Sequence, residues 1–402
     1  MSYFEKTQIL AADSPSIDSF GKWRVSNPTT LFDSKQVYNN NSNYFDTYTV
    51  GSASTTYNSG SASSTLSLTG TGRALRQTKR VFHYQPGKSQ QIIATGIFGD
   101  GVSGVVKRIG SFDDNDGIFF EQNGSSFGVT LRKTIDGVKT DTFVSQSDWN
   151  VDKLNGTGPS GLTLDITKAQ IYTYDYEWLG VGRIRYYAVL KGIPRLIHEI
   201  TNYNSLNGVY MRNPNLPIRY EISGSGTSNL TQICSTVISE GGFEFSGDRV
   251  GIHDGNSTVS GSQYGVCMYV RLHPSASNVT IIPEQIDLLV SPGNNSKFSG
   301  RWDLLINPTT SDTITWNNVS GSTISQFSVI PAVGTISDVG RVIASGYFGG
   351  TGGSNYDSQI TLSPFFGLGK TYTGTSDVLA LAIKQLENTY VVYPTMVVRE
   401  LT

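Results

Sequence analysis

Several features that would narrow the function are scarce in this chain of 402 residues. Charged residues make up only 15% of it and the net charge is −2, so nothing draws the whole chain toward nucleic acid or anionic lipid. No apolar run approaches the roughly 18 residues that a membrane-spanning helix needs. The N-terminus lacks a basic region followed by an apolar one, so we expect no signal peptide. We therefore expect no nucleic-acid partner and no membrane insertion.

Cysteine is also rare, because the chain has only two. Two cysteines in a chain of this size do not form a disulfide framework. Cys234 and Cys267 both lie in segments with strand-like patterns, where buried free thiols are the default expectation. A disulfide between them remains open if the two strands face each other.

Catalytic and cofactor motifs are scarce as well. The four histidines are scattered without metal-ligand spacing, and there is no G-x-S-x-G motif. The GDGVSG segment at 99–104 has the glycine spacing of a dinucleotide-binding loop, but a strand-like segment follows it, which favours a turn. FFGLGKTY at 365–372 resembles part of a Walker A loop, but Pro364 stands where its first glycine belongs. We expect no cofactor.

Glycoside hydrolysis requires a pair of carboxylates, and the sequence offers one weak candidate. Asp175 and Glu177 share a strand face in YDYEW, where exposed acidic residues on the outside of a sheet are the commoner interpretation. The E-x-D-x-x-E spacing of sandwich-type retaining glycosidases is absent. We therefore assign no catalytic residue and predict that the chain is not an enzyme, with a glycan depolymerase as the minority hypothesis.

The chain is rich in glycine (44 residues) and in aromatics, with 21 Tyr, 18 Phe and 5 Trp. Many turns and ample apolar area indicate an ordered, all-β protein. Residues 117–200 alternate apolar and polar side chains between glycine-containing turns, as antiparallel strands do when one face is buried. The apolar positions of this run are Phe127, Val129 and Leu131; Leu162, Leu164 and Ile166; and Tyr172, Tyr174, Tyr176 and Trp178. We interpret the Tyr172–Trp178 row as core rather than as a sugar-stacking platform.

We divide the chain into three parts on composition and pattern. Residues 1–64 are expected to be an extended N-terminal arm and polar linker, residues 65–280 a β-sandwich, and residues 281–402 a smaller β-domain. VLALAIKQL (378–386) is the best helix candidate, but the turn and β-branched segment after it favour a hairpin. The arm is expected to bind a partner, with Phe20, Trp23, Arg24 and Phe32 as its assembly anchors.

Loops at the ends of the sandwich are the remaining candidates for a ligand. The DDNDG turn supplies Asp113, Asp114, Asn115 and Asp116, and Trp149 lies in another predicted loop. Asp113 and Asn115 form a weak calcium candidate, because closely spaced oxygens suit that ion. The loop lacks the acidic residue at position twelve of a calcium loop, and turns rich in Asp, Asn and Gly arise for conformational reasons alone.

Five segments carry a resemblance to a known group. They are SFGKWRVSNPTTLFDSKQVY (19–38), FHYQPGKSQ (82–90), IGSFDDNDGIFFEQNG (109–124), FVSQSDWNVDKLNGTGPSG (143–161) and YEWLGVGRIRYYAVLKG (176–192). In these segments the chain resembles tailed-bacteriophage virion proteins, and its strand order is similar to concanavalin-like jelly rolls. The resemblance covers roughly residues 19–275 and brings no catalytic motif with it.

This resemblance implies a virion structural protein of the tail, baseplate or fibre apparatus, made in the host cytoplasm and located in the virion. Its expected partners are other virion proteins and further copies of itself. The alternatives are a capsid decoration or head-fibre protein, or a module that binds host-surface glycan.

Overall fold

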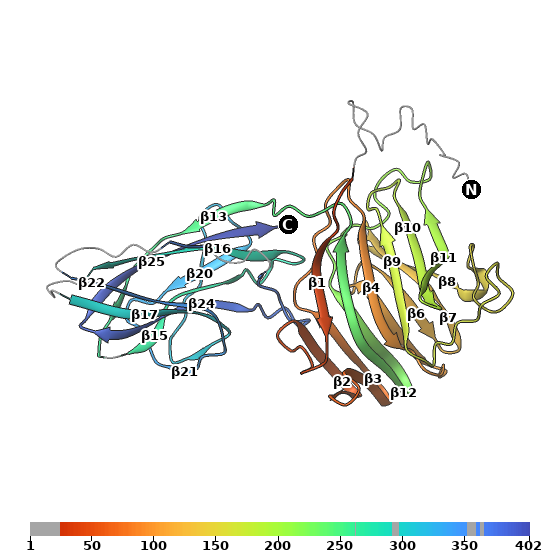
Figure 1. Cartoon of the computed structure of the whole chain (residues 1–402), viewed down its shortest axis with the longest axis horizontal. Coiled ribbons are helices and arrows are strands. Elements are labelled where there is room, and N and C mark those ends of the chain that lie inside the picture. The colour runs from red at the N-terminus through yellow and green to blue at the C-terminus, as the bar shows by residue number, and fades with distance from the viewer. Residues whose placement is uncertain (1–24, 262, 292–296, 352–358, 362–365) are drawn as a thin grey trace, which may run out of the picture.

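The computed structural model describes residues 25–261, 263–291, 297–351, 359–361 and 366–402, and within these ranges it is built almost entirely of strands. The one helical element described is a single 3-10 turn, η1 (Gln146–Asp148). Two β-domains lie beside each other along the long axis of the molecule (Figure 1). The structure confirms an all-β protein with a jelly-roll sandwich followed by a second β-domain.

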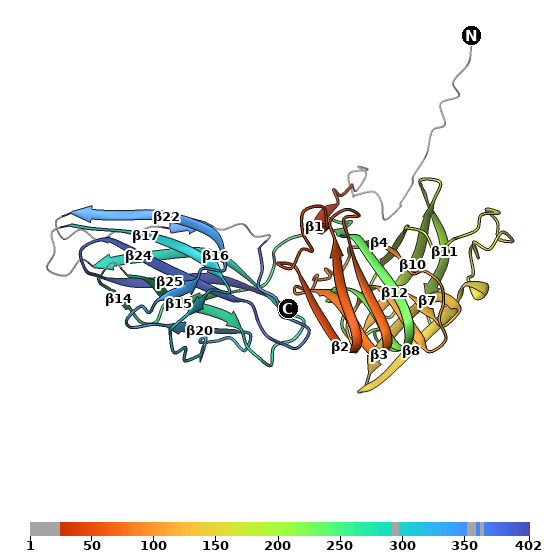
Figure 2. The same cartoon turned by 90° about the horizontal axis from the view of Figure 1, so that it is seen from below.

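The N-terminal domain is a sandwich of two antiparallel sheets that share one long strand. Its strands are β1 (Thr29–Lys35), β2 (Phe45–Asn58), β3 (Ser63–Thr78), β4 (Gln90–Ile97), β5 (Val105–Phe112), β6 (Gly117–Asn123), β7 (Ser126–Ile135), β8 (Val138–Ser145), β9 (Gln170–Tyr176), β10 (Arg183–Leu190), β11 (Ile193–Thr201) and β12 (Ile218–Ser239). We call β2-β3-β12-β5-β6-β7-β8 the first sheet and β1-β12-β4-β9-β10-β11 the second sheet. Figure 2 shows the strongly curved arrangement that results.

Strand β12 belongs to both sheets. Its first part, Ile218–Gly224, pairs with β5 on one edge and with β3 on the other. Its last part, Thr231–Ser239, pairs with β4, and residues 234–239 also pair with β1. Gly224, at the end of the first part, and Gly226, just after it, have positive φ, and the register with β4 shifts between Gln232 and Ser235. The strand can bend from one layer to the other because glycine tolerates that backbone and the bulge adds twist.

Aromatic side chains of the two sheets meet in the sandwich core. Tyr172, Tyr174 and Tyr176 are each 1% exposed, so the interpretation of this row as core is confirmed. The ring of Phe120 in the first sheet lies 4.9 Å from that of Tyr172 and 5.7 Å from that of Tyr186 in the second sheet. Such edge-on and tilted contacts are favourable arrangements for aromatic pairs.

Two expectations for this domain are wrong. Leu162, Leu164 and Ile166 lie in a loop rather than a strand, although all three pack against the core. The bridge between Asn155 and Thr163 holds this loop in place. Its apolar and polar residues alternate because the segment lies over the core. The chain from residue 29 onward is not an extended arm and linker, because β1, β2 and β3 are sheet strands.

The proposed anchors of the arm fall on both sides of that boundary. Phe20, Trp23 and Arg24 lie outside the described residues. Phe32 is buried in the sandwich core against Phe45 and Phe82, with ring centroids 5.9 and 5.2 Å away. Phe32 is therefore a core residue and is not exposed for a partner.

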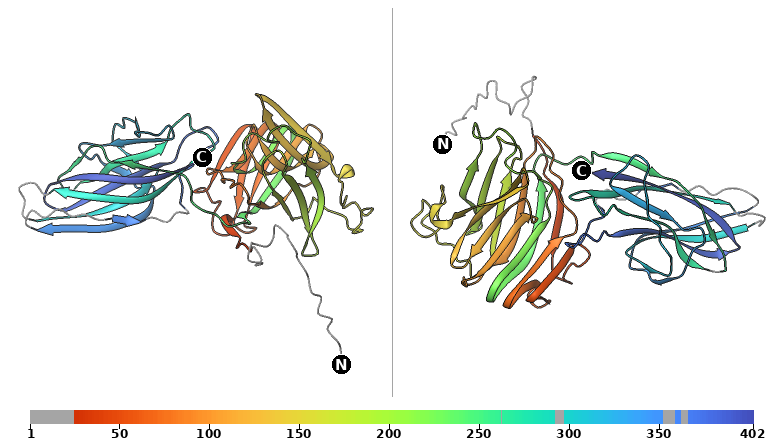
Figure 3. Two further views of the ribbon diagram at one scale, coloured as in Figure 1. Left: turned by 90° about the horizontal axis from the view of Figure 1, so that it is seen from above. Right: turned by 180° about the vertical axis from the view of Figure 1, so that it is seen from behind.

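The C-terminal domain is a second pair of antiparallel sheets. Its strands are β13 (Asp248–Ile252), β14 (Ser257–Val259), β15 (Tyr264–Leu272), β16 (Thr280–Ser291), β17 (Lys297–Ile306), β18 (Thr309–Thr310), β19 (Asn317–Asn318), β20 (Ser325–Val329), β21 (Ile336–Asp338), β22 (Arg341–Thr351), β23 (Gln359–Thr361), β24 (Val378–Glu387) and β25 (Tyr390–Leu401). One sheet has the order β13-β25-β16-β23 and the other β19-β20-β15-β24-β17-β22. Figure 3 shows this domain, coloured green to blue, beside the sandwich. Residues 378–387 form strand β24 rather than a helix, but the expected hairpin is wrong, because β24 and β25 belong to different sheets and do not pair with each other.

The expected boundary at residue 280 lies too far along the chain. Strands β13 and β15, which end before residue 273, pair with β25 and β24 of the C-terminal domain. The alternating pattern continues without a break from one domain into the next, so pattern alone does not mark this crossing. Cys234 in β12 and Cys267 in β15 belong to different domains and are both free thiols.

Candidate functional site

A loop of the C-terminal domain, residues 366–377, precedes β24 and lies against the end of β3; we call it the junction loop. The backbone N–H of Lys370 donates to the carbonyl of Lys79 at 2.9 Å, and Lys79 Nζ pairs with Asp377 at 3.2 Å. Gly369 is required here, because a Cβ at that position would overlap the Lys79 carbonyl. These contacts fix the approach of the C-terminal domain to the sandwich.

Tyr372 extends from the junction loop onto the outer face of the first sheet. Its hydroxyl accepts from Arg73 Nη1 at 2.6 Å and donates to Asp114 Oδ2 at 2.8 Å. Its backbone N–H donates to Asp46 Oδ2 at 2.8 Å, and its ring lies 4.8 Å from that of Tyr48. A residue of the C-terminal domain therefore completes a polar site on the sandwich.

Behind Tyr372 lies an alternating set of charges, which we call the arginine–carboxylate network: Arg73, Arg108, Asp114, Glu121, Arg219 and Glu221. Glu221 pairs with Arg73 at 2.7 Å and with Arg108 at 2.9 Å. Arg108 also pairs with Glu121 at 2.6 Å, and Arg219 pairs with Asp114 at 2.7 Å. Because each carboxylate contacts at least one guanidinium, the charges are compensated although Glu121, Arg219 and Glu221 are buried.

The guanidinium groups determine the charge state of the buried carboxylates. Burial alone would raise the pKa of Glu221, but Arg73, Arg219 and Arg108 outweigh it and lower that pKa below its ordinary value. Burial also opposes ionisation of Asp114, and Arg219 and Arg73 again hold the pKa well below its usual range. Both groups are therefore ionised hydrogen-bond acceptors at neutral pH.

The β5–β6 turn is shaped by Asp113. Its Oδ1 accepts from the backbone N–H groups of Asn115 at 2.7 Å and Asp116 at 2.8 Å, which is an Asx-type turn. Asp116 is fully buried and accepts from the backbone of Thr134 at 3.0 Å, and burial raises its pKa. The turn leaves Asn115 exposed and turns Asp114 toward Tyr372.

This turn and the junction loop enclose a space of about 300 Å³ between the domains, which we call the polar cleft. Its lining includes Asp113, Asp114, Asn115, Arg212, Arg219, Asn278 and Tyr372. Carboxylates supply acceptors, Arg and Asn side chains supply donors, and Tyr372 adds an aromatic ring. Such a mixture can satisfy the hydroxyl groups of a polar ligand from several sides.

The polar cleft gathers part of the predicted ligand loops. Asp113, Asp114 and Asn115 line it, whereas Asp116 lies beneath the turn. Trp149 is 2% exposed and packs on Phe127, with ring centroids 6.0 Å apart, so the structure does not place it in a ligand loop. Within the described ranges, no group of three or more His, Cys, Asp or Glu side chains could hold a metal ion. These ranges also contain no helix able to cross a membrane.

Sequence reasoning missed Arg73, Arg219, Glu221 and Tyr372. Arg219 and Glu221 occupy alternate positions of β12 and so share a face, which the segment IRYEISG signals. Their partner Arg73 lies 148 residues before Glu221 in the sequence. Only the folded topology brings these segments together with Tyr372.

His83 lies near the junction, with its Nε2 3.1 Å from the Thr280 hydroxyl of the C-terminal domain. Burial, together with the nearby Arg80 charge, lowers the pKa of His83 from 6.5 to about 4. At pH values between about 4 and 6.5, His83 is protonated in the unfolded chain but neutral in the folded chain. The stability that neutral His83 contributes is therefore complete above pH 6.5 and is lost as the pH falls toward 4.

We expect the protonation of His83 to lower the free energy of unfolding by about 2 kcal/mol when the pH falls from 7.5 to 5. Urea denaturation at the two pH values measures it. Burial also lowers the pKa of His198, which therefore adds a loss of stability of the same sign. For this reason the wild type is compared with His83→Gln, whose stability should depend less on pH. Equal pH dependence of the variant and the wild type would contradict this role for His83.

Comparisons with known proteins find similarities among solved structures only. No protein-family model matches the chain, and no curated protein matches its sequence. Among solved structures it is similar to a β-glucanase of Bacillus licheniformis at 12% identity, with 53% of this chain and 99% of that chain covered and a TM-score of 0.34. A legume lectin-like domain from Entamoeba histolytica gives 11% identity, coverage of 53% and 99%, and a TM-score of 0.31. β-Agarase A in complex with oligoagarose gives 12% identity, coverage of 52% and 92%, and a TM-score of 0.35.

These similarities correct the prediction that the chain is not an enzyme. The finding that overturns it is that a β-glucanase and a β-agarase are among the similar structures. At this level of identity the likeness shows the fold alone. Glu121 of β6 and Glu221 of β12 are both buried and both pair with Arg108.

Proposed function

We propose that this chain is a glycan-binding protein whose ligand occupies the polar cleft. The observation that carries the proposal is the convergence of Asp113, Asp114 and Asn115 with Arg212 and Tyr372 around one interdomain space. Asn115 and Arg212 are exposed, so their side chains are available to a ligand. Asp114 and Tyr372 are held in place by hydrogen bonds before any ligand arrives, which reduces the ordering cost of binding.

The chemistry of the cleft suits a saccharide. Each sugar hydroxyl both donates and accepts, so it can donate to a carboxylate such as Asp113 and accept from Arg212 or Asn115. A volume of about 300 Å³ is at the small end of ligand pockets, which suits one or two sugar rings. The two domains supply opposite walls, so a bound sugar would contact both.

The test uses a glycan array followed by calorimetry on the best glycan. We expect Arg212→Ala and Asn115→Ala each to weaken its affinity roughly tenfold, because each removes donors worth about 1.5 kcal/mol. Arg183→Ala, which changes an exposed arginine on β10, is the matched control and should bind as the wild type does. Absence of binding to every glycan, or equal affinity of the cleft variants and wild type, would refute the proposal.

The same experiment separates binding from hydrolysis. The bound glycan is incubated with the protein and assayed for newly formed reducing ends. Release of sugar would show that the cleft acts on the glycan as well as binding it. An intact glycan after binding would leave recognition as the role of the cleft.

We further propose that the protein is carried on a tailed-phage particle, in its tail, baseplate or fibre apparatus, or as a head decoration. The support is the resemblance of residues 19–275 to virion proteins. In that setting, several copies bound to other virion proteins would present their polar clefts to host-surface glycan. Immunogold labelling of intact particles tests this proposal, and particles that carry none of the protein would overturn it.

A further inference from the structure

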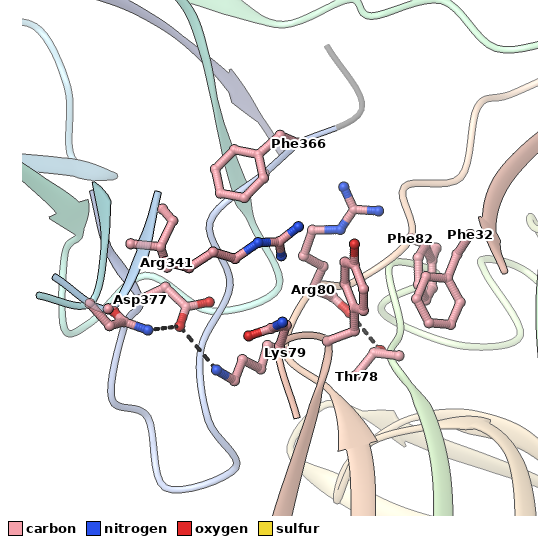
Figure 4. Close-up of a pocket in the computed structure, with 14 residues that line it drawn as sticks. Phe32, Thr78, Lys79, Arg80, Phe82, Arg341, Phe366 and Asp377 are labelled. Atoms are coloured by element: carbon pink, nitrogen blue, oxygen red, sulfur yellow. Dashed lines mark hydrogen bonds and ion pairs between the residues drawn. The ribbon is translucent and has the colours of Figure 1, made fainter. Parts of the chain in front are cut away.

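A second cavity, of about 260 Å³, lies between the two domains and is built differently from the polar cleft (Figure 4). Phe32, Tyr44 and Phe82 of the sandwich line it, and Phe366 of the junction loop lines it from the C-terminal domain. It shares only Thr78 and Lys79 with the lining of the polar cleft. We call it the cationic pocket, for the side chains described next.

Three basic residues, Lys79, Arg80 and Arg341, line the cationic pocket, whereas Asp377 is the one acidic residue in its described lining. Asp377 is already engaged, because its Oδ1 accepts from Lys79 Nζ at 3.2 Å and from Asn307 Nδ2 at 2.8 Å. The pair of Lys79 and Asp377 is neutral. The described lining therefore has a net positive charge, which comes from the guanidinium groups of Arg80 and Arg341.

Arg341 is placed at the pocket by the turn before β22. Gly340 has a φ of +60°, and a Cβ there would overlap the carbonyl oxygen of Ile306, so this close turn requires glycine. Arg341 then pairs with Ile306 in the sheet, and its Cζ lies 5.8 Å from the centroid of the Tyr44 ring. Its side chain makes no ion pair with any residue of the described ranges, and the residue is exposed.

Arg80 approaches from the sandwich. Its Nη2 donates to the carbonyl of Leu31 at 3.3 Å, and its Cζ lies 5.9 Å from the centroid of the Phe82 ring. Burial lowers the pKa of this guanidinium below its ordinary value. An anion in the pocket would be attracted to this guanidinium, since opposite charges favour each other's ionised form.

We propose that the cationic pocket binds a small ring compound bearing an oxyanion, either a carboxylate, as in a uronic acid, or a phosphate, as in a sugar phosphate. The oxyanion would lie between Arg80 and Arg341, whose planar groups bind carboxylate and phosphate oxygens in pairs. The ring would pack on Phe82 and Phe366. This site goes beyond the glycan-binding function proposed for the polar cleft and does not depend on it.

Calorimetry with glucuronate, glucose 6-phosphate and glucose tests the proposal. We expect wild-type protein to bind at least one of the two anions at least tenfold more tightly than glucose, and the preferred anion identifies the oxyanion. Raising the salt concentration should weaken that binding, because the attraction is electrostatic. No binding of either anion, or equal binding of glucose, would overturn the proposal.

Variants locate the site. Arg341→Gln should weaken anion binding at least tenfold, and Arg341→Lys should weaken it less, because the charge remains without the planar group. Arg249→Gln removes another exposed arginine of the C-terminal domain and should leave affinity unchanged. Arg212→Ala, at the polar cleft, should also leave it unchanged, so failure of one site is distinguishable from failure of the other. Unaltered affinity in Arg341→Gln would refute the assignment.

Discussion

Replacing Arg219 with methionine is expected to lower the free energy of unfolding by about 3 kcal/mol. Arg219 is 1% exposed, pairs with Asp114 at 2.7 Å and donates to Gln77 at 2.9 Å. Its guanidinium also lies 5.1 Å from the centroid of the Phe112 ring. Methionine keeps much of the side-chain volume, so the loss reports the ion pairs and the hydrogen bond of Arg219 rather than an empty space. Urea denaturation followed by tryptophan fluorescence measures it.

Arg183→Met is the matched control for that prediction. Arg183 is half-exposed and lies 3.5 Å from Glu199, and exposed ion pairs contribute between zero and about 1 kcal/mol. The two variants remove the same group from the same domain and differ in burial. If both cost the same, the arginine–carboxylate network adds no stability beyond that of a surface pair.

The second large effect is expected at Trp149. Trp149→Ala should destabilise the sandwich by about 3–5 kcal/mol, because it empties a large volume beneath the loop that follows η1. Trp149→Phe should recover most of that loss, since a smaller ring can still pack against Phe127. Thermal denaturation measures the melting temperatures, which should decrease from the wild type to Trp149→Phe and then to Trp149→Ala.

Ligand binding distinguishes this packing role from the role first predicted for Trp149. Folded Trp149→Ala protein, prepared at low temperature, should bind the glycan of the polar cleft with wild-type affinity. A selective loss of glycan affinity in a variant with wild-type stability would restore Trp149 as a ligand residue.

The sequence predicted the fold class well because its strands carry a local signal. The hairpins between residues 117 and 145 and the buried row at Tyr172–Tyr176 alternate with a period of two, which is visible without any partner strand. Strands β1 and β2 were missed because they are short of apolar residues on one face and rich in Ser and Thr. Their pairing with β12 and β3, rather than their own composition, makes them strands.

The candidate sites were only partly predictable. The β5–β6 turn was recognisable, because Asp and Asn stabilise turns by a local mechanism. Tyr372 and Arg341 gave no such signal, since each acquires its role from a segment of the other domain. Sites assembled from two domains depend on pairings that no single window of sequence contains.

The sharing of β12 between both sheets has a consequence for the order of synthesis. Strands β1, β3, β4 and β5 all need residues 218–239 as a neighbour, so none of their pairings with it can form until that segment leaves the ribosome. Before that segment emerges, more than half of the chain has been synthesised and has unpaired strand edges, which are the surfaces that drive aggregation. A chain that stops before residue 218 should consequently be insoluble, although it contains eleven of the twelve sandwich strands.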